Sequence, residues 1–126
     1  MISPSDGVFD QPGRTHVSDR VVKQIGLPED LQYKLKMHAL EKRKELQEVT
    51  DDAMVEFFAE REKVKKEKSR PPDYVHSPAN SKDFNVRLSK PIASKVEKVA
   101  KEDQATGRRL IYNGILHYAR KHKIID

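Results

Sequence analysis

Asn85 and Arg87 are the residues whose types and spacing point most directly to a chemistry. They alternate with Phe84, Val86 and Leu88, and strict alternation of apolar and polar residues over this length is typical of a β-strand with one buried face. The strand would present an amide and a guanidinium on its exposed face. These side chains can form paired hydrogen bonds with the edges of adenine and guanine, respectively. The simpler alternative is that both are exposed strand residues without a binding role.

The charge of the chain is unevenly placed. The 126 residues carry a net charge of +5. Residues 83–126 contain ten Lys and Arg and five Asp and Glu, so they hold the whole excess, whereas residues 1–82 contain fifteen of each kind. A basic segment favours a polyanionic partner, and a solvated lysine-rich surface is the alternative that charge alone leaves open.

Several classes of chemistry are not expected. The chain has no cysteine, which excludes disulfides, zinc–thiolate sites and a thiol nucleophile. The five histidines lack a metal-ligand spacing, and no catalytic triad or glycine-rich phosphate loop stands out. We therefore expect no enzyme, no cofactor and no metal. No apolar run reaches the length of a membrane span, and the first residues lack a signal-peptide core, so a soluble, cytoplasmic protein is expected.

The first part of the chain predicts a tail, a strand and two helices. Residues 1–18 are rich in Pro and Gly and are expected to form a flexible tail. The β-branched stretch Arg20–Leu27 predicts a short strand. A helix is expected from Pro28 to about Leu46, and a second from an N-cap at Thr50 through a charged, solvated extension at Glu60–Lys68.

The first of these helices is expected to have a broad apolar face. Leu31, Leu35 and Ala39 recur at helical spacing. Tyr33, Met37 and Leu40 are expected to widen this face. His38 lies on the same face and is expected to be a packed histidine rather than a metal ligand.

A proline-rich linker divides the chain into two units. Residues 69–81 contain Pro71, Pro72 and Pro78, which exclude a helix and predict an extended segment. The first unit spans residues 19–68 and the second spans residues 82–126. In the second unit, the strand leads into a helix with an N-cap at Ser89, and Gly107 is expected to end that helix. A last helix then carries a basic run at residues 120–123.

The apolar patterns of the two units coincide at one constant offset, which we call the repeat offset. Without a gap, Leu27 aligns with Leu88 and Leu35 with Val96. Neither unit is long enough to bury a core alone. We therefore expect one shared core drawn from both units: Ile25, Leu27, Leu31, Leu35, Phe57, Phe84, Val86, Leu88, Ile92, Val96, Leu110 and Ile115.

A strand and two helices within about forty residues resemble the ribbon-helix-helix superfamily of Arc- and MetJ-type DNA-binding proteins. The stretches FNVRLSKPIASKVEKVAKE and GRRLIYNGILHYA carry the resemblance. It implies a fold that is mainly α with a short two-stranded antiparallel β-ribbon. Two copies in one chain, similar to TraY-like plasmid transfer proteins, imply a single-chain pseudo-dimer.

The resemblance also implies which residues would contact DNA. Asn85 and Arg87 match the base-reading strand positions, and the first copy offers Gln24, with Lys23 nearby. Arg108, Arg109, Lys82 and Thr50 are the expected phosphate contacts, although the family more often has a small hydroxyl residue where Arg109 stands. Asp51 and Asp52 would repel a phosphate, so an asymmetric contact is expected.

These features predict a sequence-specific protein that binds double-stranded DNA through a β-ribbon in the major groove. Its role would be that of a transcriptional repressor or an accessory factor in plasmid transfer or partition, with further copies of itself on adjacent sites. The alternative is a helical protein-interaction module, such as an adaptor or an antitoxin-like partner binder. The charged helix Glu60–Lys68 and the linker would support that alternative.

Overall fold

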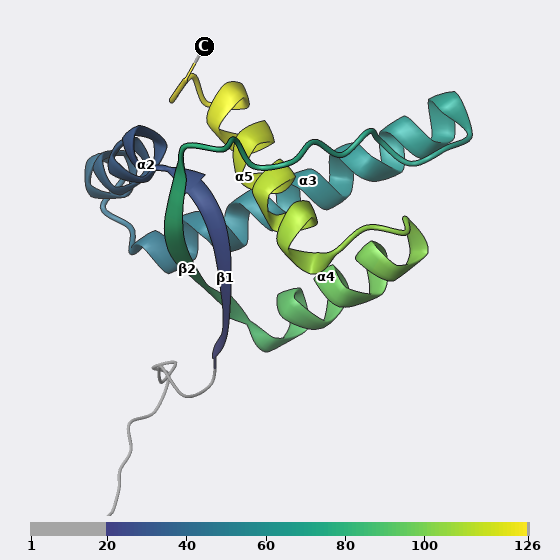
Figure 1. The fold of residues 1–126 in the computed structure, drawn as a ribbon, viewed down its shortest axis with the longest axis horizontal. Helices are drawn as coiled ribbons and strands as arrows, with labels where there is room; N and C mark the ends of the chain where they lie inside the picture. The colour runs from purple at the N-terminus through teal and green to yellow at the C-terminus, as the bar shows by residue number, and fades with distance from the viewer. Residues whose placement is uncertain (1–19, 126) are drawn as a thin grey trace, which may run out of the picture.

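The computed structural model describes residues 20–125, and the expected tail at residues 1–18 lies outside the described residues. The described chain is mainly helical, with four helices and a two-stranded antiparallel sheet (Figure 1). This confirms the predicted class of a mainly α fold with a two-stranded antiparallel ribbon. The elements follow in the order β1 (Arg20–Pro28), α2 (Glu29–Glu41), α3 (Leu46–Lys68), β2 (Ser81–Ser89), α4 (Lys90–Glu102) and α5 (Gly107–Lys121).

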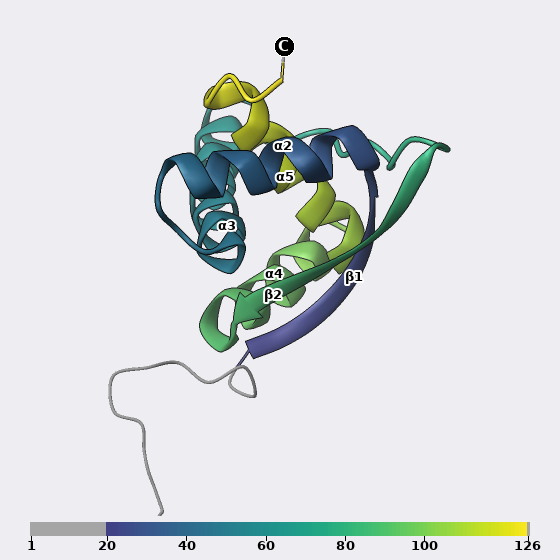
Figure 2. The same ribbon diagram turned by 90° about the vertical axis from the view of Figure 1, so that its left-hand side faces the viewer.

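The two strands form a curved ribbon along one side of the molecule, with the helices on its concave side (Figure 2). Gln24 pairs with Asn85 at the centre of the antiparallel register. Because side chains alternate between the faces of a strand, one face of the ribbon is buried and the other is exposed. The inner face buries Ile25, Leu27, Phe84, Val86 and Leu88.

The inner face of the ribbon and the helices enclose one core. All the predicted core residues belong to it except Ile92, which is only partly buried. The core also includes residues outside that list, among them Val49, Met54 and Ile111. Burying each large apolar side chain contributes about 1.5–3 kcal/mol, and both halves of the chain supply such residues to this core.

The turn between α2 and α3 corrects two predicted boundaries. α2 ends at Glu41 rather than near Leu46, because Arg43 adopts a left-handed conformation with φ 57°. α3 begins at Leu46 rather than after Thr50, because Glu45 is its N-cap. The Glu45 carboxylate accepts from the Glu48 backbone N–H, and Glu48 Oε1 accepts from the Glu45 N–H at 2.8 Å. The Thr50 hydroxyl instead donates to the Gln47 carbonyl within the helix.

The turn between α4 and α5 corrects the role of Gly107. α4 ends at Glu102, and Gly107 is the first residue of α5 rather than the residue that ends α4. Thr106 is the N-cap of α5, and its Oγ1 accepts from the Arg109 N–H at 3.1 Å. A Cβ at Gly107 would lie 3.1 Å from Glu97 Oε2, so the absence of a side chain allows this close approach.

The boundaries of the elements recur at the repeat offset, the one that aligns Leu27 with Leu88. The strands begin at Arg20 and Ser81, the next helices at Glu29 and Lys90, and the last helices at Leu46 and Gly107. The left-handed residue of the turn recurs at the same offset, as Arg43 and Gln104. The strand register is consistent with this repeat, because the pair Arg20 and Ser89 corresponds to the pair Pro28 and Ser81. The two halves therefore share the order of their elements, and the register pairs equivalent positions of the two strands at the centre of the ribbon.

The linker crosses back over the helices without helix or strand structure (Figure 1). The Val75 backbone forms two hydrogen bonds with the Asn113 side chain, at 3.0 and 2.9 Å. The Tyr74 ring packs edge-on against Phe57, and its hydroxyl donates to Asp103. Ser77 donates to the Gly26 carbonyl at 2.8 Å. These contacts fix the path of the linker over the core.

The charged extension of α3 contains one buried residue that the sequence did not predict. Arg61 is only 3% exposed, whereas most other residues of the predicted extension are exposed. Its guanidinium forms two hydrogen bonds of 2.8 Å with Asp103. Glu62 and Glu102 bind the same group at 2.7 and 3.1 Å. This cluster ties α3 to the end of α4.

The apolar face of α2 is narrower than predicted. Leu31, Leu35 and Ala39 are buried, and His38 is packed as expected. The structure corrects the expectation for the residues that would widen this face, because Tyr33, Met37 and Leu40 are exposed. They lie on the side of the helix that points away from the core.

Candidate nucleic-acid interface

The outer face of the ribbon is the surface on which the predicted base-reading side chains meet. Gln24 and Asn85 lie opposite one another at its centre, and both are exposed. Arg87 is opposite Val22 toward one end of the ribbon, and both are exposed. We use the term outer face for Val22, Gln24, Gly26, Asp83, Asn85 and Arg87. The structure therefore brings together three of the four predicted base-reading residues.

Lys23, the fourth predicted base-reading residue, is separated from this set. It lies opposite Val86, and its position along the strand belongs to the inner face. Its ammonium group forms an ion pair of 2.9 Å with Glu97 of α4. Lys23 therefore connects the edge of the ribbon to a helix instead of extending from the outer face.

Asp83 belongs to the outer face, although the sequence analysis did not select it. It is exposed and lies opposite Gly26. β2 begins at Ser81, earlier than the predicted start at Phe84. The signal that could have found Asp83 is the alternation itself, since Asp83, Asn85 and Arg87 occupy every second position of the strand.

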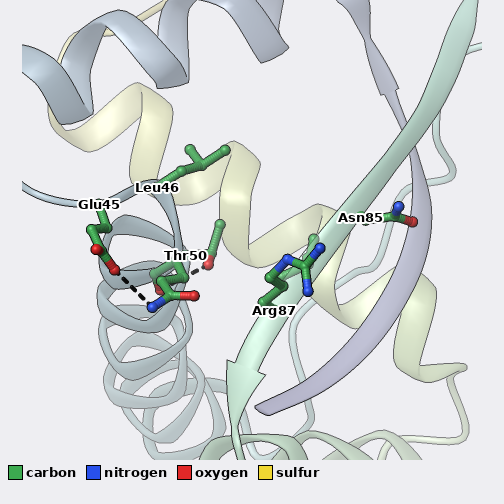
Figure 3. A pocket seen from close by; sticks show the side chains of 7 residues that line it. Glu45, Leu46, Thr50, Asn85 and Arg87 are labelled. Carbon is green, nitrogen blue, oxygen red and sulfur yellow. Dashed lines mark hydrogen bonds between the residues drawn. The ribbon is translucent and has the colours of Figure 1, made fainter. Parts of the chain in front are cut away.

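A groove separates β2 from the start of α3, and Arg87 and Asn85 lie on one side of it (Figure 3). Glu45 and Gln47 lie on the other side and are joined by a hydrogen bond of 2.8 Å. The carboxylate of Glu45 already accepts from the first turn of α3. The positive end of this helix is thus neutralised by an acid of the chain itself.

The start of α5 lies beside the other strand, in the equivalent position. Val22, Gln24, Gly107 and Arg108 line the groove between β1 and α5. Here the N-cap is the neutral hydroxyl of Thr106, and the first turn contains no acidic residue. Helix N-termini attract anions, and two adjacent arginines strengthen that preference. The Glu97 carboxylate of α4 also lines this groove beside Gly107, where it is paired with Lys23. The two helix starts therefore differ in their own first turns, because α3 is capped by an acid and α5 carries two arginines.

The predicted phosphate contacts are dispersed in the structure. Arg108 is exposed and Arg109 is half-buried at the start of α5. Lys82 is exposed, but its position along β2 belongs to the inner face, and its partner in the register is Leu27. Thr50 lines the groove beside Arg87 but is buried, and its hydroxyl is used within α3. Only the two arginines lie at a helix start beside the ribbon.

The two acids expected to repel phosphate are both paired with cations. Asp51 binds Arg20 at 2.9 Å and also accepts from the Ser89 backbone N–H. Asp52 binds Lys44 at 2.8 Å. Asp51 therefore holds one end of the ribbon against α3, and its pairing reduces the repulsion that we predicted.

Comparison with family models, with curated proteins and with solved structures found no match to this chain. Within residues 20–125, no cluster of three or more His, Asp or Glu side chains could hold a metal ion. None of the described helices combines the length and the hydrophobicity that a membrane crossing requires.

Proposed function

We propose that this chain is a single-chain, pseudo-dimeric ribbon-helix-helix protein that binds double-stranded DNA through the outer face of its ribbon. The observation that carries the proposal is the exposed set Gln24, Asn85 and Arg87 on the side of the ribbon that none of the described helices covers. Amide and guanidinium side chains are the ones that pair with adenine and guanine in the major groove. Their assembly on one exposed surface favours DNA recognition over a purely structural role.

The dimensions of the ribbon are compatible with this mode of binding. Paired strands lie about 4.8 Å apart. The major groove of B-DNA is about 12 Å wide and admits a two-stranded ribbon. The helices pack on the opposite face, so they would not prevent the outer face from entering the groove.

The charge at the two helix starts supports an asymmetric contact with the DNA backbone. The α5 start, with Arg108 and Arg109, would approach a phosphate beside β1. The α3 start would approach the phosphate beside β2, but there Glu45 occupies the amides. Backbone binding would therefore be stronger on the α5 side.

The biological role that fits this activity is that of a transcriptional repressor or an accessory factor in plasmid transfer or partition. Both roles require selective binding of a short duplex site, and both allow several copies on adjacent sites. Mapping the bound sites would distinguish them, since a repressor occupies promoters and a transfer factor occupies the transfer origin.

The test is selection of a preferred duplex from a random library, followed by fluorescence anisotropy in a salt series. Arg87→Ala is expected to weaken binding to that duplex by roughly 1–3 kcal/mol, which corresponds to about 5- to 150-fold. Arg87→Lys retains the charge but loses the paired geometry, so it should relax selectivity at one base pair. Lys66→Ala is the matched control, because Lys66 is exposed near the end of α3 and carries the same charge.

Two results would contradict the proposal. One is an affinity for duplex DNA that barely changes with salt, because neutralised phosphates release counterions. The other is an Arg87→Ala variant that binds the selected duplex as tightly as the Lys66→Ala control does.

A helical protein-interaction module is the second candidate. The end of α3 projects beyond the core (Figure 1), and its surface includes Lys63, Lys65 and Lys66. A stoichiometric protein partner, bound without any affinity for duplex DNA, would favour this candidate.

A further inference from the structure

A row of apolar side chains lies on the exposed side of α2. Tyr33, Met37 and Leu40 are spaced four and three residues apart, which aligns them along one face of the helix. Tyr33 is 62% exposed, Leu40 is 70% exposed, and Met37 is also exposed. In Figure 2, α2 lies in front of the other helices, with its outer side toward the viewer. We call these three residues the α2 stripe.

The other half of the molecule shows that the fold does not require this stripe. α4 is the equivalent of α2, and the same positions of α4 carry Ser94, Lys98 and Lys101. The outer face of a helix at this position of the fold can therefore be polar. A group of large apolar side chains exposed on one helix, but replaced by polar ones on its equivalent, indicates contact with another molecule.

The charges at the ends of α2 indicate which molecule this is. Glu29 and Asp30 lie in the first turn, and the basic residues 42–44 follow the last turn. A second α2 that runs antiparallel would place the acidic end of each helix against the basic end of the other. The opposed helix dipoles favour the same arrangement. Asp30 is already paired with Lys34 at 3.2 Å and Lys44 with Asp52 at 2.8 Å, so Glu29, Lys42 and Arg43 carry most of the complementarity between two antiparallel copies.

Most of the charged residues that flank the stripe also favour this antiparallel pairing. In an antiparallel pair centred on Met37, Lys34 of each copy, which pairs with Asp30 of its own helix at 3.2 Å, would also approach Glu41 of the other. Lys36 would approach its own equivalent near the axis, and this contact between like charges limits the affinity.

We propose that the α2 stripe is a self-association surface, on which the occupant is the α2 helix of a second copy of this chain in a two-fold, antiparallel arrangement. Three apolar residues on each side cover less area than the roughly 1,600 Å² of a standard stable interface, so the affinity is weak. This weak contact becomes populated when two copies are held close together, because their effective concentration is then high. The proposal does not depend on DNA binding, because the ribbon's outer face is a different surface.

The first test is sedimentation equilibrium of the full chain over a concentration series without DNA. The average mass is expected to rise with concentration from 14.5 kDa for one chain toward that of two chains. The variant that combines Tyr33→Ser with Leu40→Lys carries the residues found at the equivalent positions of α4. It should raise the dissociation constant by about tenfold or more. Val55→Lys is the matched control, because Val55 is an exposed apolar residue on α3.

The second test exchanges the charges at the ends of α2. One variant carries Glu29→Lys and Asp30→Lys, so both ends of its α2 are basic. The other carries Lys42→Glu and Arg43→Glu, so both ends are acidic. Each variant alone is expected to remain monomeric, whereas an equimolar mixture is expected to form a dimer.

Three outcomes would overturn the proposal. The first is an average mass of the wild type that equals one chain at every concentration. This is also the result expected if another segment of the same chain covers the stripe. The second is a Tyr33 and Leu40 variant that associates like the Val55→Lys control. The third is a charge-exchanged mixture that stays monomeric while each variant retains the circular dichroism and melting temperature of the wild type.

Discussion

Gln24 and Asn85 lie directly opposite one another at the centre of the ribbon, and each is the equivalent of the other at the repeat offset. The repeat therefore places two amide side chains opposite one another at the centre of the ribbon. Away from the centre, equivalent positions carry different side chains, because Arg87 on β2 corresponds to Gly26 on β1. If the ribbon binds DNA as proposed, the two halves of its site should differ in sequence away from the centre.

The first prediction concerns the central amides. Asn85→Ala should lower the affinity for the selected duplex by roughly 1–3 kcal/mol, because one paired contact to an adenine is lost. Gln24→Ala should act at a neighbouring base pair. Both side chains are exposed, so the melting temperature should change little. Anisotropy with duplexes substituted at each central pair measures the effect, and an equal loss on every duplex would contradict a base contact.

The ribbon could be predicted from the sequence because its signal is local. Alternation identified β2, and the β-branched stretch Arg20–Leu27 identified its partner strand, which the repeat offset then supported. The same alternation assigns Lys23 to the inner face with Ile25, so its place could have been predicted too. A strand with one buried face carries this information in every second residue.

The helix boundaries and the buried charges could not be predicted in the same way. Thr50 is a better N-cap by residue type than Glu45, but Glu45 forms the reciprocal pair with Glu48. Arg61 lies in a charged stretch that is typical of a solvated helix. Its burial depends on Asp103, which is far away in the sequence and contributes no local signal.

The second prediction concerns the buried pair of Arg61 and Asp103. Asp103→Ala would leave the guanidinium of Arg61 buried without its main partner, and Tyr74 without its acceptor. The free energy of unfolding should fall by about 3–5 kcal/mol, as measured by denaturant titration. Glu62→Ala is the control, because Glu62 binds the same guanidinium but is exposed, and it should cost less than about 1 kcal/mol. Equal effects would show that burial is unimportant here.

The same pair makes stability depend on acid pH. Burial alone raises the pKa of Asp103, but hydrogen bonds from Arg61 and Tyr74 outweigh burial and hold it below its ordinary value. A carboxyl with a lowered pKa in the folded state stabilises the fold above its unfolded pKa, about 3.9, and loses that contribution as the pH falls further. Asp103→Asn should make the free energy of unfolding fall less steeply at acid pH, whereas Glu62→Gln should leave this pH dependence unchanged.

The third prediction concerns the attachment of the linker to α5. Asn113→Ala removes both hydrogen bonds to the Val75 backbone and one to the Arg109 carbonyl. Because Val75 is exposed, water can replace the lost partners, and the global cost should be modest, about 1–2 kcal/mol. Limited proteolysis should become faster within residues 69–80 and stay unchanged elsewhere. Ser77→Ala, which removes one contact to Gly26, should have a smaller effect. Cleavage at the wild-type rate in Asn113→Ala would contradict the assignment.

The fourth prediction concerns His38, which is buried between α2 and α5 and is paired with the Tyr118 hydroxyl at 2.9 Å. Burial lowers the pKa of His38 below its ordinary value of 6.5, and electrostatic interactions with His122 and Lys42 act in the same direction. Glu41 opposes this shift, and Lys44 adds to it. The folded chain therefore binds a proton at His38 less readily than the unfolded chain does.

The sign of the pH effect follows from this difference. His38 makes its full contribution to stability above pH 6.5 and loses it as the pH falls from 6.5 through the lowered folded value. The variant with His38→Val, the residue at the equivalent position of α4, and Tyr118→Phe removes the titrating group without leaving an unpaired hydroxyl. Urea titrations at pH values on both sides of 6.5 should show a smaller loss of stability for this variant than for the wild type. The same slope in both proteins would assign the pH dependence to other groups, and an NMR titration midpoint for His38 above 6.5 would contradict its burial as the neutral form.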